Sequence, residues 1–239
     1  ASALETACTL AYNGSTAYDI VDTHVKGMRF RMAVYQPVPG KVEDIVSKNI
    51  RRDGFWDLTK TKMIESQLSA SPGSVFVDVG ANIGWFSIVL SVMGHKTYAI
   101  EPFSSNLDLL RLSACINPGV EENLVVVPYG LHMKNESCEL WQVPTINMGD
   151  THSVCDGAND NITVENMAKE GYVKVGSMKT APLDWLVESG QIDFGNKPSI
   201  FKMDIEGFEH HAMMGATRML ARTPPRFMVS EFTPSMIEG

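Results

Sequence analysis

The 239-residue chain has few of the features that assign a protein to a membrane, a repeat fold or nucleic acid. No apolar run approaches the ~20 residues that a membrane-spanning helix needs, and there is no internal repeat or low-complexity tract. Basic residues are outnumbered, so the formal net charge is -8. This charge argues against non-specific nucleic-acid binding, which relies on Lys and Arg neutralising phosphates. The length suits one large domain, or a domain with an added lobe, that buries a sizeable core.

Cysteine is also scarce and carries no metal-binding pattern. Cys8, Cys115, Cys138 and Cys155 form no C-x-x-C pair and have no zinc spacing. Cys115 lies in a helix-like segment, where we expect a small buried hydrophobe. Cys138 and Cys155 could meet across a hairpin, but we interpret them as free thiols.

Signals for export are weak. Three N-x-S/T sequons begin at Asn13, Asn135 and Asn161, and chance nearly accounts for them in a chain rich in Asn, Ser and Thr. The chain starts without a basic-then-apolar leader, so any targeting segment was removed or never included. The sequence therefore leaves the compartment unknown. We expect a soluble domain, and a cytoplasmic location is slightly favoured.

The first 72 residues contain no chemical motif. Residues 18–25 and 28–35 alternate loosely around Lys26-Gly27, which indicates a hairpin. Residues 42–49 and 59–68 have helical spacing, with Asp57 or Thr59 as possible caps. We predict that residues 1–72 form an extension of a hairpin and helices that packs on the core.

From residue 73 the pattern alternates between strand and helix. Such alternation predicts an α/β fold: a Rossmann-like three-layer sandwich with a mostly parallel sheet and right-handed crossovers. A polar stretch at about 131–179 interrupts the alternation, and we interpret it as a hairpin insertion after the third strand. The predicted strands are 75–79, 97–100, 124–127, 199–203 and 227–232, and the predicted helices are 85–93, 106–116, 182–188 and 208–220.

The most informative stretch follows the first of these strands. Asp78 ends an apolar run, and Gly80 and Gly84 then frame a turn into a helix. Glycine lets the backbone turn sharply and approach a ligand closely. The dinucleotide pattern G-x-G-x-x-G fails, because Asn82 and Trp85 occupy its second and third glycine positions. An acidic residue beside a glycine turn suits the cationic S-adenosylmethionine better than a pyrophosphate.

Carboxylates end four of the five predicted strands: Asp78, Glu101, Asp204 and Glu231. Glu101 follows Gly80 at about the ~20 residues expected of the acid that accepts two ribose hydroxyls; the alternative is a helix cap. We expect Asp78 to orient the glycine turn, or to bind the methionine ammonium through water. The amide of Asn82 could hold the loop or form an Asx-turn.

Three segments together resemble the FkbM family of S-adenosylmethionine-dependent methyltransferases. They are FVDVGANIG at 76–84, IEP at 100–102 and FKMDIEGFE at 201–209, and LDWL at 183–186 is similar to the family pattern as well. The resemblance covers roughly residues 50–235. It implies a class I methyltransferase fold and methyl transfer to hydroxyl oxygens of sugars or polyketide-type products. It also implies that the cofactor is bound by Asp78, Gly80, Asn82, Gly84 and Glu101. We add Pro102 and Tyr129 to these cofactor-binding residues.

Methyl transfer to oxygen needs alignment and a base for the hydroxyl proton. Asp204 is the first candidate, with holding the cofactor amine or capping the next helix as its alternative roles. Glu206 is the second. His132 and His152 are further candidates because imidazole titrates near neutral pH. Lys202 is expected to pair with Asp78 or Asp204.

A metal is not required by this pattern, and we predict none. Asp204 and Glu206, joined by Asp150 or Glu231, would be the oxygen ligands of a magnesium or calcium ion if one bound. The predicted partner is a sugar, glycan or small-molecule acceptor. Two other functional classes stay open: a Rossmann-like module that has lost catalysis, and, less favoured, an NAD-dependent oxidoreductase.

Overall fold

The computed structural model describes Cys8 and residues 17–40, 42–142, 152–155, 169–195, 197–205 and 207–230. Its centre is a five-stranded sheet in the order β11-β10-β3-β4-β5, and every neighbouring pair is parallel. The strand order reverses between β3 and β10, as in doubly wound folds. This sheet confirms the predicted α/β, Rossmann-like fold. Its strands are β3 (Val75–Val79), β4 (Thr97–Ile100), β5 (Leu124–Val127), β10 (Ser199–Met203) and β11 (Phe227–Ser230).

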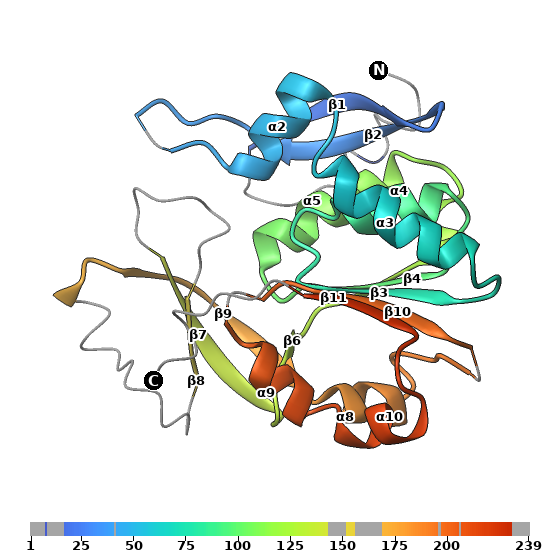
Figure 1. Cartoon of the computed structure of the whole chain (residues 1–239). Helices are drawn as coiled ribbons and strands as arrows, with labels where there is room; N and C mark the ends of the chain where they lie inside the picture. The colour runs from blue at the N-terminus through green and yellow to red at the C-terminus, as the bar shows by residue number, and fades with distance from the viewer. Residues whose placement is uncertain are drawn as a thin grey trace.

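Helices cover both faces of the sheet and complete three layers (Figure 1). One layer contains α3 (Leu58–Ser69), α4 (Trp85–Val92), α5 (Ser104–Cys115) and α6 (Val120–Asn123). The opposite layer contains α8 (Leu183–Glu188), α9 (Glu209–Met214) and α10 (Thr217–Arg222). Side chains of β3 alternate between two buried clusters: Phe76 joins the cluster beneath α4 and α5, and Val75 and Val77 join the other. Burial on both faces explains the continuous apolar runs of these strands.

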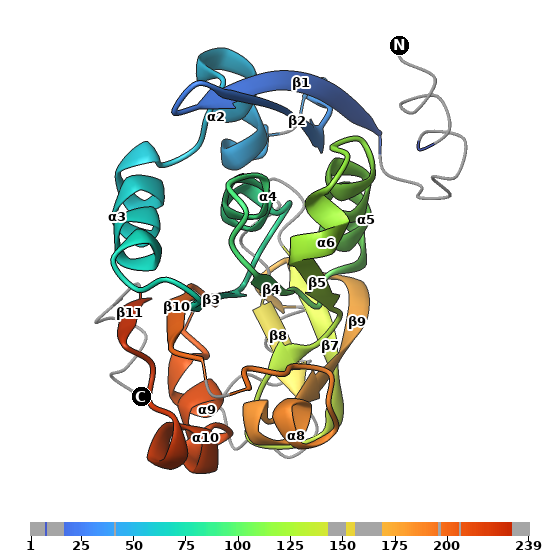
Figure 2. The ribbon, with the colours of Figure 1, turned by 90° about the vertical axis from the view of Figure 1, so that its right-hand side faces the viewer.

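The N-terminal hairpin forms an outer layer over the helices, on the side away from the sheet (Figure 2). Strands β1 (Tyr18–Val25) and β2 (Met28–Tyr35) pair antiparallel around the Lys26-Gly27 turn, as predicted. The Ala33 amide donates to Ser113 Oγ on α5 at 2.9 Å, which fastens the hairpin to the core. Helix α2 (Ile45–Asp53) starts later than predicted, because Asp44 caps it by accepting from the Ser47 amide. The division into an extension and a core domain stays a prediction.

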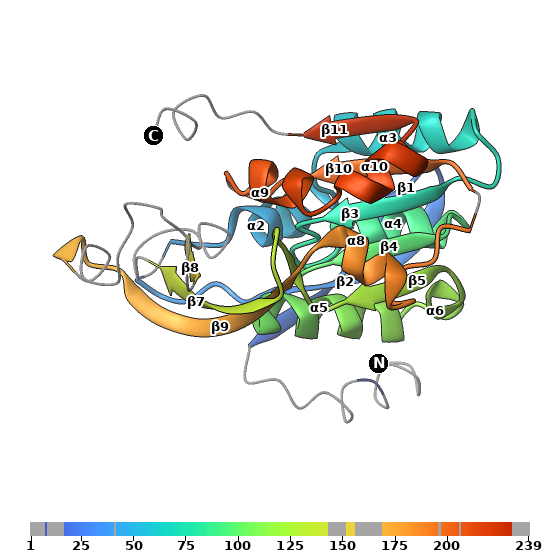
Figure 3. The same ribbon diagram turned by 90° about the horizontal axis from the view of Figure 1, so that it is seen from below.

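The insertion forms a second sheet that curves away beyond the carboxyl ends of the parallel strands (Figure 3). Its order is β6-β9-β7-β8, with β6 (Gly130–Leu131), β7 (Glu136–Gln142), β8 (His152–Cys155) and β9 (Val173–Ala181). Within the described ranges, no helix is both long and apolar enough to cross a membrane.

The free-thiol interpretation is wrong. Cys138 and Cys155 lie opposite each other in the β7–β8 ladder and form a disulfide, with Cα atoms 4.1 Å apart. Cys115 is exposed at the end of α5 and is bonded to Cys8. The Cys8–Cys115 disulfide joins residues 107 positions apart, so local sequence spacing does not predict it.

The helix predicted at 208–220 is interrupted. Gly215 separates α9 from α10, and a Cβ there would lie 2.3 Å from the backbone oxygen of His132. The Gly215 carbonyl accepts from the Asp184 amide at 3.0 Å instead of continuing a helix. This break lets the start of α8 and the insertion approach the layer closely.

Candidate functional site

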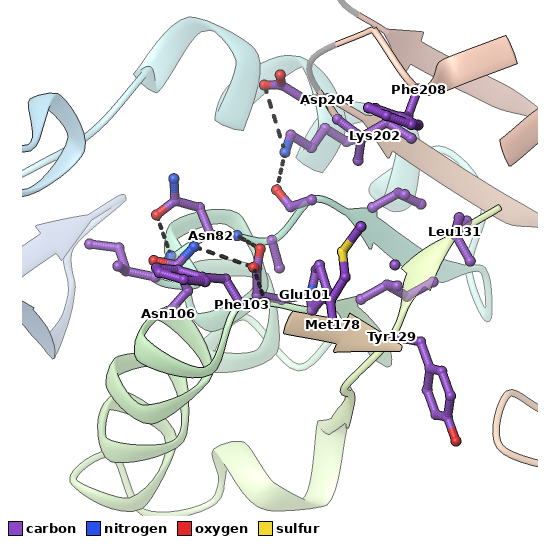
Figure 4. A pocket seen from close by; sticks show the side chains of 18 of the residues that line it. Asn82, Glu101, Phe103, Asn106, Tyr129, Leu131, Met178, Lys202, Asp204 and Phe208 are labelled. Atoms are coloured by element: carbon purple, nitrogen blue, oxygen red, sulfur yellow. Dashed lines mark hydrogen bonds and ion pairs between the residues drawn. The ribbon is translucent and has the colours of Figure 1, made fainter. Parts of the chain in front are cut away.

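A cavity of about 280 Å³ opens at the carboxyl ends of the parallel strands, where the strand order reverses (Figure 4). This is the position at which open α/β sheets bind ligands. Two residues assigned to the site, Asp78 and Gly84, do not line the cavity, and Glu206 lies outside the described residues. Seven assigned residues do line it: Gly80, Asn82, Glu101, Pro102, Tyr129, His132 and Asp204.

The glycine turn holds the ends of β3 and β10 close together. Gly80 has φ +75°, and a Cβ there would lie 2.0 Å from the backbone oxygen of Asp204. Gly84 has φ +91°, and a Cβ there would lie 2.8 Å from Leu110 Cγ, so glycine lets α5 approach the turn closely. Its assignment to cofactor binding stays a prediction. Asn82 has φ +53° and its Oδ1 accepts from the Ile83 amide at 2.6 Å, which holds the loop locally.

Glu101 is the buried acceptor of the site. Its side chain accepts from the backbone amides of Asn82 and Phe103, both at 2.8 Å, and from Asn106 Nδ2 at 3.3 Å. Burial raises the pKa of Glu101, and the two backbone donors oppose that shift. A carboxylate can accept about four hydrogen bonds. Three are satisfied by the protein, so Glu101 keeps capacity for about one more donor from a ligand.

Lys202 lines the cavity and ties the two strand ends together. Its Nζ donates to the Gly80 carbonyl at 2.7 Å and lies 3.4 Å from Asp78 Oδ1 and 3.8 Å from Asp204 Oδ2. Asp78 is fully buried and its Oδ2 accepts from Ser87 Oγ at 2.7 Å. Burial raises the pKa of Asp78, while the Lys202 ammonium opposes the shift. The predicted pairing of Lys202 is confirmed, and Asp78 is placed to orient the glycine turn.

Asp204 is the acid that faces the cavity directly. Its side chain is 26% exposed and lies within 4.0 Å of two ammonium groups, those of Lys202 and Lys60. Figure 4 shows it across the cavity from Asn82 and Glu101. The two strand-end carboxylates, Glu101 and Asp204, therefore line the same cavity. The fourth such acid, Glu231, lies outside the described residues.

His132 occupies the wall that the insertion contributes. Its ring is almost completely buried, and Nδ1 lies 2.9 Å from Glu136 Oε1. The ring stacks on His211 of α9, with centroids 4.9 Å apart and planes 14° apart. A carboxylate that orients an imidazole is the usual arrangement of a general base. Of His152, only the backbone in β8 is described.

The remaining wall contains Pro102, Phe103 and Tyr129. The Tyr129 ring extends away from Glu101 (Figure 4) and packs against Trp185 at a centroid distance of 5.9 Å. The assignment of Pro102 and Tyr129 to cofactor binding stays a prediction, with less geometric support for the Tyr129 ring.

Sequence reasoning missed three polar residues of this region. Asn106 lies in the first turn of α5, five residues after Glu101, and this local spacing could have revealed it. Glu136 follows His132 by four residues, which is a visible signal only once the turn between them is known. Lys60 approaches Asp204 from α3, and no sequence signal links the two.

One group of side chains has metal-ligand spacing among the described residues. Ligand atoms of His132, Glu136 and Cys155 all lie within 4.8 Å of one another. The Cys155 sulfur is in a disulfide and is not available as a thiolate. Three of the oxygen ligands considered from sequence lie outside the described residues, so the absence of a metal stays a prediction: Asp150, Glu206 and Glu231.

The strand order, the glycine turn and the cavity at the reversal define a Rossmann-like α/β protein with a ligand site at its switch point. The chain belongs to the FkbM methyltransferase family, because the family model described as "Methyltransferase FkbM domain" matches residues 78–238.

Two individual proteins are similar to this chain. Hexuronic acid methyltransferase AglP from Haloferax volcanii is 29% identical over 151 residues, which are 63% of this chain and 53% of that protein. The chain thus matches about half the length of that relative. A solved methyltransferase FkbM from Methylobacillus flagellatus KT is 20% identical, with a TM-score of 0.39, and the match covers 65% of this chain and 32% of that chain.

Proposed function

We propose that this protein is an S-adenosylmethionine-dependent methyltransferase that methylates a hydroxyl oxygen of a sugar acceptor. The observation that carries the proposal is the cavity at the strand reversal, in which Glu101 and Asp204 lie on opposite sides of the glycine turn. Membership in the FkbM family supports the reaction class.

The residues around the cavity fit this cofactor. Glu101 is buried and retains capacity for a ribose hydroxyl. The Gly80 turn has no side chain to block a close approach, and Asp204 offers a carboxylate to a positively charged amine or sulfonium. When bound, S-adenosylmethionine supplies an electrophilic methyl group on a positively charged sulfur. The protein has to align the acceptor oxygen and remove its proton.

We assign the proton-accepting role to His132 rather than to Asp204, the first candidate from sequence. His132 is oriented by Glu136 and lines the same cavity as Asp204. Asp204 lines the wall opposite Asn82 and Glu101 with its side chain 26% exposed, and we assign it to a cationic part of the cofactor. Proton acceptance by His132 and binding of the cofactor cation by Asp204 are thereby assigned to two different walls of the cavity.

The acceptor class follows from the relative and from the base. AglP is named for hexuronic acid, and we extend a sugar acceptor of that class to this chain. A hexuronic acid offers both hydroxyls and a carboxylate. A carboxylate is already deprotonated near neutral pH, so a general base is useful only for a hydroxyl. The His132–Glu136 pair therefore favours ether formation.

Cofactor choice is tested by calorimetry with S-adenosylmethionine and with NAD, on the same protein. Binding of the sulfonium cofactor alone is expected. Binding of NAD without the sulfonium cofactor would establish the oxidoreductase alternative, and binding without any methyl transfer across saccharide acceptors would favour the inactive module.

The base is tested with His132→Asn and Glu136→Gln, against His210→Asn, which changes an exposed histidine of α9. Removing a general base typically costs about 10²- to 10⁴-fold in rate. We expect a loss of that size in kcat for His132→Asn, with cofactor affinity kept, and no loss for His210→Asn. A product whose methyl group is released by mild alkali would be a methyl ester, and the assignment of His132 as base would then be wrong.

A further inference from the structure

Every cysteine of the chain is used in a disulfide. The sequence has four cysteines, and they form the pairs Cys8–Cys115 and Cys138–Cys155. The first pair fastens a residue near the N-terminus to α5, and the second joins β7 to β8. Disulfides persist in oxidising compartments and are rare where glutathione and thioredoxin keep thiols reduced. Complete pairing therefore indicates folding in an oxidising compartment, in contrast to the cytoplasmic location favoured from sequence.

One of the three sequons lies in the described part of the chain. Asn135-Glu136-Ser137 begins in the turn after β6 and continues into the first residues of β7. The middle position is not proline, as the modification requires. The sequons at Asn13 and Asn161 lie outside the described residues.

Both essential residues of this sequon are exposed at the start of β7. Asn135 and Ser137 are exposed, whereas Glu136 is half-buried and Cys138 is buried. Successive side chains of a strand point to opposite faces, so Ser137 of β7 faces away from Glu136 and Cys138, and Asn135, just before the strand, is exposed as well. Glu136 points inward to His132 and Cys138 to its disulfide. A bulky glycan on Asn135 would project into solvent without displacing the cavity wall.

We propose that Asn135 carries an N-linked glycan, which is added while the exported chain folds in an oxidising compartment. The amide nitrogen of Asn135 forms the new bond to the anomeric carbon of a lipid-linked oligosaccharide. The bond from that carbon to the pyrophosphate oxygen breaks, and the lipid pyrophosphate leaves. The amide proton leaves with it, so no oxidant is needed for this step. The disulfides form separately, by exchange with an oxidising dithiol–disulfide protein.

The test is expression of the chain behind a cleavable secretion signal in a eukaryotic cell. Peptide mapping after enzymatic glycan release in heavy-oxygen water marks each occupied asparagine. We expect Asn135 to be marked, and alkylation of the denatured, unreduced protein to find no free thiol. Mapping is needed because the other two sequons could also be occupied.

Three variants make the assignment specific. Asn135→Gln and Ser137→Ala should lose occupancy of this position completely, and Ser137→Thr should retain it, because threonine also completes the sequon. None of these residues lines the cavity, so Asn135→Gln should keep the wild-type rate of methyl transfer. An unmodified Asn135 in secreted protein with both disulfides formed would overturn the proposal, as would free thiols in protein from its native source.

Discussion

Replacing Glu101 by glutamine should weaken the binding of S-adenosylmethionine by about 10- to 150-fold. A hydrogen bond to a charged group contributes about 1.5–3 kcal/mol, and each 1.4 kcal/mol corresponds to about tenfold in affinity. The substitution keeps the length of the side chain. It leaves one of the backbone amides of Asn82 and Phe103 facing an NH₂ group. An unsatisfied buried donor costs about 1–3 kcal/mol, which is less than the 5–15 kcal/mol stability of a typical domain. The variant should therefore fold.

The pH dependence of binding adds a second signature of Glu101. Burial raises the pKa of this carboxyl above its ordinary value of 4.5. The ionised form accepts hydroxyl donors at both oxygens, so cofactor affinity should fall as the pH decreases through the raised pKa. Glutamine does not titrate, and Glu101→Gln should lack this component of the pH dependence.

The assay is isothermal titration calorimetry of the wild type and Glu101→Gln across a pH series. The matched control is Glu122→Gln, which removes an exposed carboxylate on α6, outside the cavity. The control should bind like the wild type. Wild-type affinity in folded Glu101→Gln would refute the assignment of Glu101 to the ribose hydroxyls.

Three further perturbations test the framework of the site. Gly80→Ala should abolish cofactor binding and destabilise the fold more than Gly94→Ala. At Gly94 a Cβ has no neighbour within 4 Å, so that substitution costs only the about 1–2 kcal/mol of placing alanine in the left-handed backbone conformation. Equal losses of unfolding free energy in the two variants would contradict the close approach at Gly80. Replacing both Cys138 and Cys155 by serine should lower the unfolding free energy by about 3 kcal/mol, the value for a 15-residue loop, and an unchanged denaturation midpoint would contradict the disulfide. The raised pKa of Asp78 means that the folded state binds the carboxyl proton more tightly than the unfolded state does. The free energy of unfolding should therefore fall as the pH rises from 3.8 through the raised pKa of the folded state. Denaturation of Asp78→Asn over the same pH range should lack this pH dependence.

The regular part of the fold was predictable because its signals are local. The apolar runs of β3 and β10 are buried on both faces, and the Lys26-Gly27 turn fixes the register of its hairpin. Asp57 was named as a possible cap, and its side chain accepts from the Lys60 amide at the start of α3. Each of these features depends on residues within a few positions of one another.

The positions of Glu101 and Asp204 could also be predicted, because parallel strands bring their carboxyl ends to one edge. The partners of these acids were less accessible to sequence reasoning. Lys60 reaches Asp204 across the layers, and Cys8 reaches Cys115 over 107 residues. Such contacts depend on how helices are placed on the sheet, which no short segment specifies.

The most direct measurement is transfer of an isotopically labelled methyl group from S-adenosylmethionine to oligosaccharides that contain hexuronic acid. The wild type should label the saccharide in a form stable to mild alkali, and His132→Asn should bind the cofactor while transferring little label. Cofactor binding with no label in any saccharide would contradict a sugar methyltransferase. Alkali-labile label, or full transfer by His132→Asn, would contradict hydroxyl methylation with His132 as base.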